Sequence, residues 1–304
     1  MATKTAVLLI THGTVADLAD LPAFVKNIRR GAEPPPELIR ELRHRYEVIG
    51  GSSPLGTITE SLARKLEAKL GLSVRTCMRL WKPYPEDVLP TLGADRVVVL
   101  ALAQHSAKVY EDAVRAAAAK LPAPPDIRAV PNWGREPALL DAFARRVVEA
   151  VQGLDATERA KTALVLSAHS LPKAIVDAGD AYEREARAAA EGVAERVREL
   201  LQDARIAFQS QGLSTGPGGR PVVWLGPDLP STFDAAKNDG RARVVVAPIG
   251  FLADHVEILY DLDVEAKALA KDRGLELVRT RSLNDDDDFV DVLAGLVRRA
   301  SGGA

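Results

Sequence analysis

The segment Ala163-Leu-Val-Leu-Ser-Ala-His169 has a close counterpart in Ala6-Val-Leu-Leu-Ile-Thr-His12. Both are short, largely apolar runs, and each ends in a histidine six residues after its first alanine. Continuous apolar runs of this length are typical of parallel strands that are buried on both faces of a sheet. The runs Ala6–Ile10 and Ala163–Leu166 are therefore each predicted to be such a strand, and the chain is predicted to contain two related halves.

Two further apolar runs, 97–102 and 244–247, are also predicted to be buried strands. Longer segments rich in Ala, Arg, Glu and Leu separate the runs. Strands in alternation with helices predict an α/β fold with helices on both faces of each parallel sheet. The boundary between the halves is expected near 152–161. The predicted helices are 38–48, 61–70, 110–120, 138–151, 182–201 and 289–300.

Four of the five histidines follow predicted strands. In open α/β sheets, ligands bind beyond the carboxyl ends of the strands. We therefore expect a ligand cleft between the two halves, near His12, His105, His169 and His255.

The composition excludes several classes of partner and cofactor. The net charge of the 304 residues is −2, so there is no basic field that would predict a nucleic-acid partner. The single cysteine, Cys77, cannot form an internal disulfide, and the chain lacks four cysteines for an iron–sulfur cluster. No Gly-x-Gly-x-x-Gly or Gly-x-Ser-x-Gly motif supports a dinucleotide cofactor or a serine nucleophile, and no organic cofactor is expected.

The lengths of the apolar runs also indicate where in the cell the protein is expected. The run at 97–103 is too short to span a bilayer, and the N-terminal run is too short for the core of a signal peptide. We expect a cytoplasmic protein without a transmembrane segment, and peripheral membrane contact stays open.

Two groups of polar residues could carry chemistry. His169 follows a buried strand, where its imidazole could accept protons near neutral pH or simply bond to the backbone. Glu257, Asp261 and Glu265 stand four residues apart and would form an acidic stripe along one face of an α-helix. Their mutual repulsion suggests a cation path or proton relay, and a solvated helix face is the alternative.

Cationic and hydroxyl groups cluster near the N-terminus. Arginine side chains in Ile28-Arg29-Arg30-Gly31 and Arg45-Tyr46 suit carboxylates. The turn Gly50-Gly-Ser52-Ser53-Pro-Leu55 could bind an anion before the following helix. Each motif taken alone is equally compatible with a charged surface or an ordinary turn.

Taken together, several motifs resemble ferrochelatases, in the family's order and over most of the chain. They are Ile28-Arg-Arg-Gly31, Arg45-Tyr-Glu-Val-Ile-Gly-Gly-Ser-Ser-Pro-Leu55, Ser167-Ala-His-Ser-Leu-Pro172, Gln209-Ser-Gln-Gly212, Trp224-Leu-Gly-Pro-Asp228 and Pro248-Ile-Gly-Phe-Leu-Ala-Asp-His-Val-Glu257 with Tyr260-Asp261. The N-terminal motif is most similar to that of the soluble, monomeric coproporphyrin-type enzymes.

The resemblance implies two similar Rossmann-like halves, 1–152 and 153–304, as in class II chelatases. It implies a metal-inserting lyase that places Fe²⁺, its substrate, into coproporphyrin III or protoporphyrin IX during haem biosynthesis. His169 and Glu257 would be catalytic and, with Asp261 and Glu265, would contact metal. A regulatory divalent cation on the acidic stripe stays open, as does the choice between proton acceptor and metal ligand for His169. The implied porphyrin-binding residues are His12, Ile28, Arg29, Arg30, Arg45, Tyr46, Ser52, Ser53 and His105.

Two alternatives remain at this stage. His12-Gly-Thr is similar to the strand end of the smaller sirohydrochlorin chelatases, which insert cobalt or iron. The chain could also be a tetrapyrrole-binding protein without catalysis, although the presence of both His169 and Glu257 argues against that.

Overall fold

The computed structural model describes residues 3–212 and 220–302, which fold as two compact units. The first unit takes the described parts of Met1–Trp133, Ala253–Val256 and Asn284–Ala304. The second unit takes those of Gly134–Leu252 and Glu257–Leu283. Each unit is built around one parallel sheet.

The sheet of the first unit has the strand order β2-β1-β3-β4, with all pairs parallel. Its strands are β1 (Thr5–Thr11), β2 (Ser73–Met78), β3 (Arg96–Ala101) and β4 (Asp126–Ala129). The two central strands are the predicted apolar runs, and both are buried almost throughout. Their burial on both faces explains why they contain so few polar residues.

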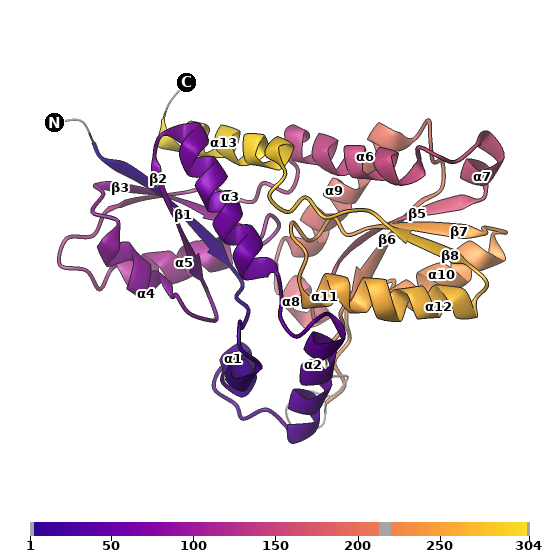
Figure 1. Cartoon of the computed structure of the whole chain (residues 1–304), viewed down its shortest axis with the longest axis horizontal. Helices are drawn as coiled ribbons and strands as arrows, with labels where there is room; N and C mark the ends of the chain where they lie inside the picture. The colour runs from indigo at the N-terminus through magenta and orange to yellow at the C-terminus, as the bar shows by residue number, and fades with distance from the viewer. Residues whose placement is uncertain (1–2, 213–219, 303–304) are drawn as a thin grey trace. The chain divides into compact units, whose positions relative to one another are not determined.

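Helices cover both faces of this sheet (Figure 1). On one face lie α3 (Leu55–Leu70) and α13 (Asp287–Ser301), and on the other lie α4 (Pro85–Val88) and α5 (Ala107–Ala118). The remaining helices of the unit pack around a separate apolar cluster that includes Phe24, Tyr46 and Trp81. They are α1 (Leu21–Ile28) and α2 (Pro36–Val48), with a short 3₁₀ turn at Leu18–Asp20. A second 3₁₀ turn, Leu89–Thr91, follows α4, and its Leu89 packs in the core with residues of α5.

The second unit repeats the same plan. Its sheet has the parallel order β6-β5-β7-β8, formed by β5 (Thr162–His169), β6 (Ala204–Gln209), β7 (Arg243–Ala247) and β8 (Glu276–Arg279). In both sheets the first strand in the chain lies between the second and the third. The repeat that the two histidine-ended segments predict is therefore confirmed in the strand topology.

The helices of the second unit also form two layers (Figure 1). One layer contains α6 (Pro137–Val151) and α9 (Tyr182–Val197), and the other contains α10 (Leu229–Asn238) and α12 (Lys267–Asp272). Gly192 of α9 lets the first two helices approach closely, because a Cβ atom there would lie 2.6 Å from Leu140 Cδ1. The short helices are α7 (Ala156–Ala160), α8 (Lys173–Asp177) and α11 (Val256–Leu259).

Two helices pack in a different unit from the one that their position in the sequence predicts. Helix α6 lies before residue 152 but packs in the second unit, whereas α13 ends the described chain and packs in the first. The Phe289 ring of α13 stacks on Trp133, with 6.3 Å between ring centroids. The Trp133 indole in turn donates a hydrogen bond of 2.9 Å to the Ala101 carbonyl of β3.

Candidate active site

His169 is the last residue of β5, a strand that is buried along the rest of its length. The backbone is fixed there, because the Tyr182 hydroxyl donates to the His169 carbonyl over 2.9 Å. The ring Nδ1 is hydrogen-bonded to the Ser170 carbonyl, which can only accept. Nδ1 therefore carries the proton in the neutral ring, and Nε2 presents a lone pair.

Glu257 lies opposite that lone pair. Its Oε2 is 3.5 Å from His169 Nε2, and the two side chains are 37% and 34% exposed. This separation is longer than a well-formed hydrogen bond, so neither group is saturated by the other. Uptake of a proton or a cation between the two groups would not require a strong mutual hydrogen bond to be broken.

The loop after β7 reaches His169 because it carries a glycine at the point of contact. A Cβ atom on Gly250 would lie 2.6 Å from the Ala168 Cα atom, closer than packing allows. The Gly250 N–H donates to the Ser167 carbonyl over 3.0 Å. The next residue, Phe251, has its ring centroid 6.3 Å from that of the His169 imidazole.

Gln209 connects the two strands of the site with Glu257, and the sequence motifs assigned it no role. It ends β6 in register with His169 and is buried. Its Oε1 accepts from the Ser167 hydroxyl over 2.7 Å, and its Nε2 lies 3.4 Å from the Glu257 carbonyl. In the sequence, the position of this polar residue at the end of an otherwise apolar stretch was the signal that could have predicted a site role for Gln209.

The prediction of a regular α-helix for the acidic stripe is wrong. Glu257 lies in the four-residue α11, whereas Asp261 and Glu265 fall in a π-helical turn, Asp261–Ala266, that leads into α12. The Glu265 N–H bonds to the Tyr260 carbonyl, five residues back, over 3.0 Å. The wider turn accommodates one extra residue, which composition and spacing did not reveal.

The three acidic side chains consequently have different surroundings. Asp261 is buried and accepts a short hydrogen bond from Ser210, a residue with a left-handed φ of 58°. Glu265 is exposed. In residues 3–212 and 220–302, no group of three or more His, Cys, Asp or Glu side chains is arranged to hold a metal ion. The structure thus brings His169 and Glu257 together, and the described residues add no third ligand to form such a group.

The predicted porphyrin-binding histidines lie in the first unit, at the carboxyl ends of its strands. His12 follows β1 and is exposed, with its Nδ1 3.4 Å from the Tyr110 hydroxyl. The guanidinium of Arg79 lies over the Tyr110 ring at 5.7 Å. His105, in contrast, is only 3% exposed, so its imidazole is a buried group of the loop after β3.

The predicted binding residues near the N-terminus, Ile28 and three arginines, differ in exposure and in ion pairing. Ile28 and Arg30 are exposed at the end of α1, where Arg30 has a left-handed φ of 56°, and Arg29 is half-buried. Arg45 is already paired with Glu41 over 2.7 Å. Arg29 and Arg30 are therefore better placed than Arg45 to receive a ligand carboxylate.

The other predicted binding residues of this unit are mostly covered. Tyr46 is 2% exposed within its apolar cluster, and its hydroxyl lies 3.3 Å from that of Thr14. Ser53 is buried just ahead of α3, whereas Ser52 is exposed. Ser52 alone of this group presents a hydroxyl that solvent or a ligand can reach directly.

Among the described residues, no helix is both long enough and apolar enough to span a bilayer. Cys77 is buried, as predicted, and its burial raises the pKa of the thiol. It is therefore a packing residue and not a nucleophile.

Two solved structures share the fold. A protein from Deinococcus radiodurans, described as similar to chelatases with two additional domains, aligns with a TM-score of 0.58 over 97% of this chain and 55% of its own. CbiX, described as the terminal enzyme of sirohaem biosynthesis in denitrifying bacteria, aligns with a TM-score of 0.55 over 97% of this chain and 99% of its own. Both are 16% identical to the chain, so they support the architecture alone.

Sequence relatives are much closer. A ferrochelatase of Herpetosiphon aurantiacus is 36% identical and aligns over 98% of this chain and 99% of its own. A coproporphyrin III ferrochelatase of Geobacillus thermodenitrificans is also 36% identical, over 98% of this chain and 96% of its own. The family model named Ferrochelatase matches residues 4–301. With its paired histidine and glutamate at the end of β5 and a family match over nearly its whole length, the chain belongs to the ferrochelatase family.

Proposed function

We propose that this chain inserts Fe²⁺ into coproporphyrin III in haem biosynthesis, a metal-inserting lyase reaction. The observation that carries the proposal is the pairing of a lone-pair nitrogen of His169 with the carboxylate of Glu257 at 3.5 Å. Metal insertion replaces two pyrrole N–H protons by one Fe²⁺, so it needs groups that accept protons beside the point of entry. A neutral imidazole facing a carboxylate supplies such groups.

The proton path follows from the hydrogen bonds of His169. Its Nδ1 is committed to the Ser170 carbonyl, so only Nε2 can take a pyrrole proton. The imidazolium that forms is then stabilised by the negative charge of Glu257. Solvent reaches both side chains. The first pyrrole proton can therefore pass from His169 to solvent before the second is removed from the porphyrin.

The proposed porphyrin contacts are carboxylate contacts. Coproporphyrin III carries four propionates and protoporphyrin IX carries two, so the former demands more cationic partners. Among the described residues, no carboxylate pairs with Arg29 or Arg30, whereas Arg45 is paired with Glu41. The relatives named coproporphyrin III ferrochelatase favour the same substrate.

The deciding experiment compares initial rates of Fe²⁺ insertion by the purified chain into coproporphyrin III and protoporphyrin IX. We expect a higher kcat/KM for coproporphyrin III. The reverse preference would reassign the substrate, and tight porphyrin binding without a metallated product would indicate a non-catalytic tetrapyrrole-binding protein. Replacement of Arg29 and Arg30 by Ala should raise the porphyrin KM about tenfold, since a charge-assisted hydrogen bond contributes ~1.5–3 kcal/mol.

We further propose that the protein acts as a monomer in the cytoplasm. Neither sheet depends on a second copy for any of its strand pairings in the described residues. Sedimentation velocity across a range of concentrations tests the assembly state, and cell fractionation tests the location.

A further inference from the structure

Strand pairing shows which residues at the carboxyl ends of the two sheets are equivalent. The repeat aligns His12 with His169, because the two histidine-ended segments pair in the same register with the third strand of their sheets. His169 is paired with Gln209 at the end of β6. In the first unit, the register of β1 and β2 continued by one residue places Arg79 beside His12, and the Arg79 N–H donates to the Thr11 carbonyl over 2.9 Å. Arg79 is therefore the counterpart of Gln209.

In each unit, a helix that follows the third strand supplies a partner for the histidine. Helix α11 supplies Glu257, whose Oε2 lies 3.5 Å from His169 Nε2. Helix α5 supplies Tyr110, whose hydroxyl lies 3.4 Å from His12 Nδ1. A phenol thus occupies in the first unit the role that a carboxylate has in the second.

The two equivalent sets of side chains consequently carry opposite charge. The set in the second unit has the negative charge of Glu257, whereas the set in the first has the positive charge of Arg79 and a phenol that is neutral at physiological pH. A negative site attracts cations and a positive site attracts anions. The repeated fold therefore offers a cation site at the end of one sheet and an anion site at the end of the other.

The Arg79 guanidinium is held in place but keeps its hydrogen-bonding edge. It lies over the Tyr110 ring at 5.7 Å from the centroid, and its residue is half-buried. In residues 3–212 and 220–302, no carboxylate pairs with it. An aromatic ring contacts the face of a guanidinium, so the N–H donors in its plane can still form a bidentate contact with a carboxylate.

We propose that Arg79 is a further substrate-binding residue, and that its guanidinium donates to one propionate of the porphyrin at the carboxyl end of the first sheet. The proposal rests on the porphyrin substrate proposed above, and it adds a third arginine to Arg29 and Arg30. Tyr110 acts through Arg79, because its ring supports the guanidinium.

The first test measures binding of coproporphyrin III without iron, by quenching of porphyrin fluorescence. Arg79→Gln should raise the Kd about tenfold, because it removes a charge-assisted hydrogen bond. Arg64→Gln is the matched control: Arg64 is exposed on α3, and its loss changes the net charge equally, so the Kd should stay within about twofold. Arg79→Lys keeps the charge without the planar fork and should recover part of the affinity.

The second test asks whether Arg79 acts through a carboxylate. The tetramethyl ester of coproporphyrin III has the same macrocycle and no carboxylate, so Arg79→Gln and wild type should bind it equally in the same detergent solution. Steady-state rates of Fe²⁺ insertion should show a raised porphyrin KM with kcat within about twofold of wild type, since His169 and Glu257 are unchanged.

The binding measurements separate this proposal from the proposed reaction. If wild type binds coproporphyrin III and forms no metallated product, the reaction fails, whereas a raised Kd in Arg79→Gln still supports the contact. A wild-type Kd in Arg79→Gln overturns it. So does an equal increase of Kd for the acid and its tetramethyl ester, because that result would assign Arg79 a purely structural role.

Discussion

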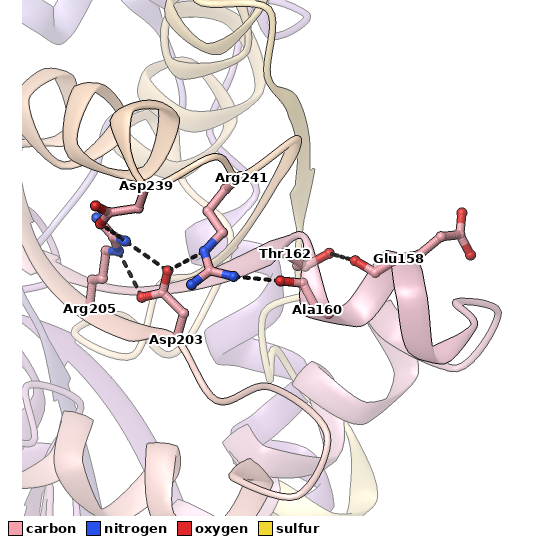
Figure 2. Close-up of polar contacts among 7 residues, drawn as sticks. All are labelled: Glu158, Ala160, Thr162, Asp203, Arg205, Asp239 and Arg241. Atoms are coloured by element: carbon pink, nitrogen blue, oxygen red, sulfur yellow. Dashed lines mark hydrogen bonds and ion pairs between the residues drawn. The ribbon is translucent and has the colours of Figure 1, made fainter.

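The two ends of the sheet β6-β5-β7-β8 carry charged groups in opposite states. At the carboxyl end, His169 Nε2 and Glu257 Oε2 face each other at 3.5 Å, a separation longer than a well-formed hydrogen bond. At the amino end, Asp203 lies between Arg205 and Arg241, which bind both of its carboxylate oxygens at 2.7–2.8 Å (Figure 2).

The network at the amino end extends beyond this carboxylate. Arg205 also bonds to Asp239 over 2.6 Å, and Arg241 donates to the Ala160 carbonyl (Figure 2). The Asp203 side chain is only 15% exposed, so removal of one partner would leave a charge that water compensates poorly. The saturated charges at the amino end therefore serve stability, whereas the two groups at the carboxyl end are not joined by a strong mutual hydrogen bond.

The largest effect is expected from His169, one of the two groups at the carboxyl end of the sheet. His169→Ala should lower kcat by at least about 100-fold, because it removes the proton-accepting nitrogen, and it should change the thermal midpoint little. Steady-state kinetics and differential scanning calorimetry on the same preparation measure both. A variant with normal turnover would exclude His169 from the mechanism.

Glu257→Gln sharpens the assignment of charge within that pair. The side chain keeps its size and loses its negative charge, so kcat should fall about 10- to 100-fold while the porphyrin KM stays near wild type. Glu257→Asp, which keeps the charge on a shorter side chain, is the matched control and should retain more activity. Equal losses in both variants would indicate that position, and not charge, is what matters.

Asp203→Asn tests the other end of the sheet and should give the converse result. It should cost about 2 kcal/mol of unfolding free energy at neutral pH with little change in kcat. Burial alone would raise the pKa of Asp203, but hydrogen bonds and charge from Arg205 and Arg241 outweigh it and hold the pKa below its ordinary value.

The sign of the pH dependence follows from that lowered pKa. The stabilising contribution of Asp203 is fully present above the pKa of the carboxyl in the unfolded chain, and it is lost as the pH falls through the folded-state value. The difference in stability between wild type and Asp203→Asn should therefore shrink in acid. Urea titrations of both proteins at neutral and at strongly acidic pH measure this difference in unfolding free energy. A difference that is the same at both pH values would indicate that the network contributes through packing alone.

Glu265→Ala should have the smallest effect of the four. The side chain is exposed near the end of the π-helical turn, so kcat should change less than about threefold. Any effect should appear in the dependence of the rate on Fe²⁺ concentration, which would support metal supply or a regulatory cation at this end of the stripe. A loss comparable to that of Glu257→Gln would restore the uniform relay that the sequence spacing suggested.

The central strands could be predicted because burial on both faces leaves a continuous apolar run, as at β1 and β5. The edge strands β2 and β8 mix polar with apolar residues and are only partly buried, so their sequences do not separate them from loops. His169 and Glu257 were predictable as a pair from family motifs. Their separation was not, because it depends on contacts of Gly250 and Gln209, which are far apart in the chain.

The π-helical turn marks the limit of arguments from spacing. Residues four apart in an α-helix lie a little more than one turn apart, whereas in a π-turn they fall short of one turn. Asp261 and Glu265 are therefore related by a different rotation from the one that a regular helix predicts. Tertiary contacts, among them the bond from Ser210 to Asp261, accompany the wider turn, and no local residue pattern encodes them.

The placement of α13 in the first unit has a consequence for how the protein is made. A ribosome releases β1 to β4 early, but one face of that sheet awaits α13, whose Phe289 stacks on Trp133. The second unit, with α6 already synthesised, can complete its two helical layers first. The part of the chain that emerges first thus completes the coverage of its sheet last, and apolar surface on one face of that sheet stays accessible until α13 has been synthesised.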